Sequence, residues 1–198
     1  MGLQLPRWVW VGAVCLSCVA GMVNVVGFLG LGHQGLGHLS GATSQMGIAM
    51  RQGQWHPAVD LLGLLLAFSL GAMLSGLVIQ DQALRLGRRY GVMLLIESLL
   101  LLLAIPLFQR GLIHGAWVAA AACGIQNALA TTFSGAAVRT THLTGMFTDL
   151  GIGLGHLLRG MPLAVRRLSL SALIICGFLL GSVTGALLYD LAGYHALL

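Results

Sequence analysis

The sequence predicts an all-α integral membrane protein of about five transmembrane helices and two short re-entrant half-helices, arranged as inverted repeats. Three observations predict it: apolar runs of spanning length, a polar segment that occurs twice, and a composition that is 58% hydrophobic and only 8% charged over 198 residues. A soluble domain of this size cannot bury so much apolar surface in one core, whereas about 20 apolar residues cross the hydrocarbon of a bilayer.

Five apolar runs are long enough to span the bilayer. The first follows a single arginine and continues too far to be the apolar core of a cleaved signal peptide, so we expect it to be retained. Leucine dominates the next two, which include DLLGLLLAFSLGAMLSGLVI and GVMLLIESLLLLLAIPLF. The expected spans are residues 8–31, 58–79, 90–108, 112–134 and 169–189.

Two polar, glycine-broken segments lie between these spans. GHLSGATSQMG at 37–47 separates the first span from the second, and THLTGMFTDLG at 141–151 separates the fourth from the fifth. Each leaves room for only roughly 12–15 helical residues, which suits a half-helix better than a full span. We expect these helices to start near Gly41 and Gly145, with Ser40 and Thr144 as N-caps.

The polar segments belong to a longer internal repeat. GMVN at 21–24 parallels GIQN at 124–127, and AFSLGAMLS at 67–75 parallels GFLLGSVTG at 177–185. A three-span unit reverses direction when it is repeated, so the halves would be inverted copies within one membrane domain. We expect a first membrane repeat at 1–110 and a second at 111–198 whose final span is missing, a gap that a homodimer or a partner membrane subunit could fill.

Arginine positions favour segments that re-enter the membrane over segments that cross it. With the N-terminus cytoplasmic and both segments re-entrant, only Arg51 and Arg110 are outside, whereas full crossing gives at best six arginines inside and four outside. The eight cytoplasmic arginines would be Arg7, Arg85, Arg88, Arg89, Arg139, Arg159, Arg166 and Arg167. Because they cluster between apolar spans, they predict cytoplasmic loops and not a nucleic-acid surface.

The stretch GIQNALATTFSGAAVRTTHLTGMFTDLGIGLG at 124–155, with GMVNVVGFLGLG and HLSG earlier, resembles the YoaK-like family of bacterial inner-membrane proteins. The resemblance covers nearly the whole chain. It implies a multi-pass protein of the bacterial inner (cytoplasmic) membrane and supplies no substrate. The chain departs from the family pattern at Ala42, where members often carry asparagine, and at its end, where members tend to continue into a final apolar span.

Polar side chains recur at matching positions of the two halves. A stripe at seven-residue spacing, on about one helix face, comprises His38, Gln45 and Gln52 in the first half and His142, Asp149 and His156 in the second. We expect these stripes to turn inward and line a solute path; interhelical hydrogen bonding without transport is the alternative. The expected path residues are Asn24, His38, Ser40, Thr43, Ser44, Gln45, Gln126, Asn127, Thr141, His142, Thr144, Thr148 and Asp149.

Two carboxylates fall within the membrane in this arrangement. Asp149 is the first candidate for a proton or ion site, because burial and a nearby helix N-terminus would act on it in opposite directions and leave it able to titrate. Glu97, inside the third span, is the second candidate, or else a partner that holds the bundle together.

The sequence therefore predicts a small-solute transporter or channel with a path between the inverted repeats. The alternative is a non-transporting structural or accessory subunit of a membrane complex. We expect no enzyme, because the sequence has neither a nucleotide-binding loop nor a nucleophile motif such as G-x-S-x-G. Dispersed histidines and methionines likewise predict no metal site, and we expect no cofactor.

Overall fold

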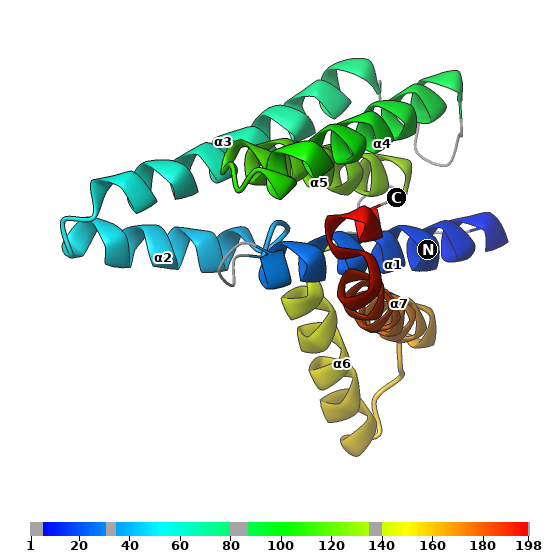
Figure 1. The fold of residues 1–198 in the computed structure, drawn as a ribbon. Coiled ribbons are helices and arrows are strands. Elements are labelled where there is room, and N and C mark those ends of the chain that lie inside the picture. The colour runs from blue at the N-terminus through cyan, green and yellow to red at the C-terminus, as the bar shows by residue number, and fades with distance from the viewer. Residues whose placement is uncertain (1–5, 31–34, 80–86, 135–139, 198) are drawn as a thin grey trace.

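The computed structural model describes residues 6–30, 35–79, 87–134 and 140–197, and every regular element among them is a helix. The elements are α1 (Arg7–Gly30), α2 (Leu39–Arg51), α3 (Trp55–Val78), α4 (Arg88–Gln109), α5 (His114–Phe133), α6 (Leu143–Leu158), α7 (Val165–Ala192) and η1 (Gly193–Leu197). The second and sixth helices, α2 and α6, contain most of the two polar segments and are called the polar helices for that reason. A short 3₁₀ helix follows the last α-helix (Figure 1).

Four helices in the described part of the chain are long and apolar enough to cross a membrane: α1, α3, α4 and α7. This establishes an all-α membrane protein. The fifth expected span corresponds to α5. This helix is not one of the four, and its 20 residues include the polar pair Gln126 and Asn127. Many small, buried residues line α5, so it is a central helix of the bundle, with little contact with lipid.

Two apolar clusters mark the opposite ends of the bundle. At one end the starts of α1, α4 and α7 meet the ends of α3 and α5, through Val9, Tyr90, Leu170, Ile79 and Leu129. At the other end the starts of α3 and α5 meet the end of α4 and η1, in a cluster that contains Leu61, Ala116, Phe108 and Tyr194. Helices α1, α4 and α7 therefore run in one direction, and α3 and α5 run in the other.

Glycines allow two pairs of helices to cross at backbone contact. A Cβ atom at Gly21 of α1 would overlap the carbonyl group of Phe178 on α7, and one at Gly181 would overlap that of Cys18. The crossing of α5 with α3 has the same form: Gly124 meets the carbonyl group of Phe68, and Gly71 meets that of Ala121. Small residues permit such close approach between helices in a membrane.

The polar helices each pack on the helix that follows them. Helix α2 runs back along the first turns of α3 and buries Ala42 and Ala49, while α6 packs on α7 and buries Met146 and Gly153. Figure 1 shows α2 and α6 leaving the bundle in different directions. Neither carries the chain from one end of the bundle to the other, because α1 and α3, like α5 and α7, run in opposite directions.

The predicted starts of the two helices were wrong by two residues. Helices α2 and α6 begin at Leu39 and Leu143, and their N-cap residues are His38 and His142, neither of which makes a side-chain capping bond. Ser40 and Thr144 are therefore inside the helices. A glycine can occupy a first helical turn, so Gly41 and Gly145 are poor guides to where a helix starts.

The polar stripe does not turn inward along α2. Gln45 and Gln52 are exposed, because the face that packs on α3 is the alanine face. In the second half Asp149 and His156 are half-buried. Of the arginines that favoured the re-entrant arrangement, Arg85 and Arg139 lie outside the described residues.

Candidate functional site

The two polar segments meet beside α1, at a place that we call the junction and define by Asn24, Gly37, His38, Thr141 and His142. The backbone N–H of Gly37 donates a hydrogen bond of 3.1 Å to Oδ1 of the buried Asn24. A Cβ atom at Gly37 would lie 3.1 Å from Cγ2 of Thr141. The segments are far apart in sequence and touch here, within the length of α1 and not at its end.

Both polar helices start at the junction. The first helical hydrogen bonds run from Ala42 to His38 in α2 and from Met146 to His142 in α6. The backbone N–H groups before them have no acceptor within their own helix, and the partial positive charge of the helix dipole is greatest there. Two helix N-termini thus face one region of the bundle, which is an arrangement suited to a polar or anionic group.

The two N-cap histidines are placed differently. The ring of His38 stands edge-on to that of Phe178, with 6.2 Å between ring centroids. The ring of His142 instead lies over its own helix, where a Cβ atom at Gly145 would collide with it. Nothing lies within 4 Å of a Cβ atom at the matching Gly41. The start of α6 is therefore covered by a histidine, and the start of α2 is open.

The remaining predicted path residues of α2 and α6 do not gather at the junction. The hydroxyls of Thr43, Ser44 and Thr148 donate to backbone carbonyls four residues earlier in their own helices, and these residues are exposed. Such bonds satisfy a hydroxyl without any partner helix. Of the expected set in these segments, the structure brings together His38, Thr141 and His142.

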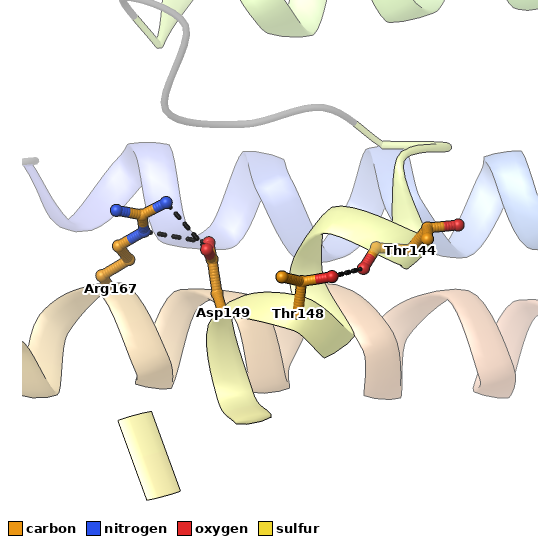
Figure 2. A network of polar contacts seen from close by, with 4 residues as sticks. All are labelled: Thr144, Thr148, Asp149 and Arg167. Carbon is orange, nitrogen blue, oxygen red and sulfur yellow. Dashed lines mark hydrogen bonds and ion pairs between the residues drawn. The ribbon is translucent and has the colours of Figure 1, made fainter. Parts of the chain in front are cut away.

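Asp149 is bound to an arginine that the stripe did not predict. Its carboxylate accepts two hydrogen bonds from Arg167 at the start of α7, from Nε at 2.9 Å and from a terminal nitrogen at 2.7 Å (Figure 2). This is a bidentate pair, which fixes the orientation of both groups. The Arg167 side chain is 72% exposed and that of Asp149 is 18% exposed. That Asp149 exchanges a proton stays a prediction.

The predicted residues of α4 and α5 form a second polar group inside the bundle. Glu97 is joined to Gln126 by a side-chain hydrogen bond. Asn127, the repeat equivalent of Asn24, has a buried Oδ1 without a hydrogen-bond partner. The two asparagines thus share a position in the matching motifs GMVN and GIQN but not a bonding role.

A family model described as a protein of unknown function, DUF1275, matches residues 12–198. The chain belongs to this family. The match confirms the resemblance to the YoaK-like proteins that the sequence indicated. No curated protein and no solved structure matches the chain.

Two site residues of this DUF1275 chain escaped sequence reasoning. Thr140 is fully buried just before the junction, and its hydroxyl has no hydrogen-bond partner. It could have been noticed as the polar residue that precedes Thr141. The sequence indicates Arg167 only as a cytoplasmic charge, and no local pattern pairs it with Asp149, because the contact depends on how α6 folds back onto α7.

Proposed function

We propose that this protein is a small-solute transporter or channel whose path passes through the junction. The observation that carries the proposal is that both polar helices start there, one in each half of the chain. Helix N-termini inside a membrane can bind a polar group without any charged side chain. Asn24, His38, Thr141 and His142 would line the path, and the exposed residues farther along α2 and α6 would not.

The same arrangement supports an inverted repeat. The crossing of α1 with α7 and that of α5 with α3 use matching residues, Gly21 with Phe178 and Gly124 with Phe68. Each crossing joins the first helix of one half to the third helix of the other. The halves would be related by an approximate two-fold axis, as in transporters built from inverted repeats.

The described arginines support a topology with the N-terminus in the cytoplasm. Arg7, Arg88 and Arg89 lie at the starts of α1 and α4, and Arg159, Arg166 and Arg167 lie beside the start of α7. This is the end of the bundle where the starts of these three helices meet, and Arg51 and Arg110 belong to the other end. The positive-inside rule favours a cytoplasmic position for the first end. The resemblance to the YoaK-like proteins supports the inner membrane of a bacterium as the location.

Single cysteines test this topology in a variant whose four native cysteines are replaced. Cysteine at position 51 or 110 should react with an impermeant maleimide from outside intact cells, and cysteine at position 89 or 159 should react only after permeabilisation. Equal reaction of positions 51 and 89 in intact cells would contradict the re-entrant arrangement.

Solute flux tests the function itself. Proteoliposomes of the purified protein should shrink and reswell, measured by stopped-flow light scattering, faster than protein-free liposomes for at least one class among small polyols, weak acids, ammonium and alkali-metal salts. Gly37→Leu should reduce that flux at least tenfold, because the side chain would enter the contact with Thr141.

The matched control is Gly47→Leu, on α2, where a Cβ atom meets nothing within 4 Å. It should leave the flux unchanged. If proteoliposomes of the wild-type protein match protein-free liposomes for every class, the proposal fails and the accessory-subunit alternative is favoured.

A further inference from the structure

The only glutamate of the chain, Glu97, is buried in the middle of a membrane-spanning helix. It belongs to the inward row of α4, between Met93 and Leu101, and is 5% exposed. Acidic side chains are costly in hydrocarbon and face the interior of a bundle when they occur. A carboxyl group at this position has to be stabilised by the groups around it.

Among the residues that the structure describes, those surroundings hold one polar partner of Glu97 and no counter-charge. The amide of Gln126, itself 2% exposed, is hydrogen-bonded to Glu97. The second carboxyl oxygen, Oε2, is buried and has no hydrogen-bond partner. The nearby thiol of Cys123 is also buried. By contrast, the carboxyl group of Asp149 has both oxygens bound to a guanidinium.

The described titratable groups on the elements packed against α4 do not supply a counter-charge for Glu97. Helix α5 presents Cys123, while η1 presents Tyr194 and His195, which contact Phe108 and Gln109 about three turns away along α4. Asp60 of α3 lies near the start of α5, where its carbonyl accepts a bond from Trp117. On α4 itself, Arg88, Arg89 and Tyr90 lie about two turns before Glu97.

We propose that Glu97 is a proton-binding site inside the membrane and that it couples proton movement to the solute movement proposed above. A bare carboxylate with one amide partner would be strongly disfavoured there, whereas the neutral acid has only hydrogen bonds to satisfy. A metal cation fits less well, because the described residues contain no group of three or more histidine, cysteine or acidic side chains. The proton is the one cation that a single carboxyl group binds fully.

Helix α5, which also packs on α1, carries a second buried amide next to Gln126. Gln126 is followed by Asn127, whose Oδ1 is buried without a partner and whose repeat equivalent Asn24 binds the first polar segment. Consecutive residues of a helix point about 100° apart, so α5 carries one amide towards Glu97 and the next towards a different neighbour. The coupling role rests on the proposed function, while proton binding at Glu97 does not.

Proton binding is tested with an apolar carbodiimide, which adds to a protonated carboxyl group in an apolar site. The wild-type protein in native membranes should gain one adduct, located at Glu97 by peptide mass spectrometry. Its yield should fall as the pH is raised from mildly acidic to alkaline, and a water-soluble carbodiimide should not produce it. Asp149→Asn should leave the yield unchanged, and Glu97→Gln should abolish it.

The absence of an adduct at Glu97, or a yield that does not change with pH, would overturn the proton site. This outcome uses the wild-type protein, so it does not depend on whether a variant folds.

Coupling is tested in proteoliposomes with an imposed pH gradient. Solute should accumulate against its gradient with the wild-type protein. With Glu97→Gln, accumulation should fall to the equilibrium level while downhill flux persists. Accumulation by Glu97→Gln equal to that of the wild type would contradict coupling. A pH-dependent adduct at Glu97 without any solute flux would instead refute the proposed transport and leave the proton site standing.

Discussion

Asn24 of α1 binds the first polar segment at its start. The second polar segment is instead held by the ion pair between its own Asp149, almost two turns into α6, and Arg167 of α7. The two helices otherwise start at one junction and pack on the helix that follows each of them. The side chain equivalent to Asn24, Asn127, leaves its oxygen without a partner. Matching positions of the two halves therefore share their packing and differ in the polar contacts that hold the segments.

In the proposed repeat, the difference shows which part of the unit is most constrained. The helix crossings depend on backbone contact, which only glycine allows, and both halves keep them. A hydrogen bond or an ion pair can be supplied from several positions, so each half can anchor its segment in its own way. We expect variants at the crossings to damage both halves alike, and variants at the anchors to act on one half only.

The largest effect is expected at the crossings. Gly181→Ala and Gly71→Ala each place a Cβ atom on a backbone carbonyl group of the facing helix, which cannot move away as a flexible side chain can. Overpacking of this kind typically costs about 1–3 kcal/mol, and we expect the upper part of that range for both variants. Thermal unfolding in detergent, followed by circular dichroism, measures it.

Gly76→Ala on α3 is the control, because a Cβ atom there meets nothing within 4 Å. Alanine is the better helix former, so this variant should be as stable as the wild type or more so. A large loss in one crossing variant and none in the other would show that the two crossings are not equivalent.

A smaller and one-sided effect is expected at the asparagines. Asn24→Ala leaves the N–H of Gly37 without its acceptor in a buried place, which should cost about 1–3 kcal/mol of unfolding free energy. Asn127→Ala removes an oxygen that has no partner, so it should cost less than about 1 kcal/mol. Equal losses at the two positions would mean that the unmatched oxygen of Asn127 has a role that the hydrogen bonds do not show.

The sequence was sufficient for the parts of this fold that depend on composition and periodicity. Apolar length located the membrane helices, and the repeated motifs located the two polar helices. The same motifs contain the glycines of both crossings, but which helices they would bring together came only from the structure. The orientation of the polar stripe was not predictable in the same way. Either of two faces of α2 could in principle pack on α3: the face with Ala42 and Ala49, or the face with Gln45. The alanines allow closer packing, and their face is the one that is buried.

Contacts between segments were the least predictable part of the site. The meeting of Gly37 with Thr141 requires both segments to fold back to the same level of the bundle, which no local pattern specifies. Pairing of Asp149 with Arg167 likewise depends on the angle between α6 and α7. Glu97 and Gln126 could each be found as polar residues in a span, but their hydrogen bond required the packing of α4 on α5.

The smallest effect is expected at the ion pair of Asp149 and Arg167. Because Arg167 is 72% exposed, solvent screens the pair, and exposed pairs contribute about 0.2–1 kcal/mol in double-mutant cycles. A cycle of Asp149→Asn, Arg167→Gln and the double variant should give a coupling energy in that range. The coupling should shrink when the salt concentration is raised.

Arg166→Gln serves as the matched control, since Arg166 is an exposed neighbour on the same turn of α7. Its coupling to Asp149→Asn should be near zero. In the register that aligns His38 with His142, the first half has Gln45 where the second has Asp149. In the register that aligns Phe68 with Phe178, it has Pro57 where the second has Arg167, so the first half cannot form this pair. Asp149 would then be a local anchor of α6, and its replacement should leave the carbodiimide reaction of Glu97 intact. A coupling well above 1 kcal/mol, insensitive to salt, would instead mean that the pair is shielded from water and that the second segment is held as firmly at Asp149 as the first is at Asn24.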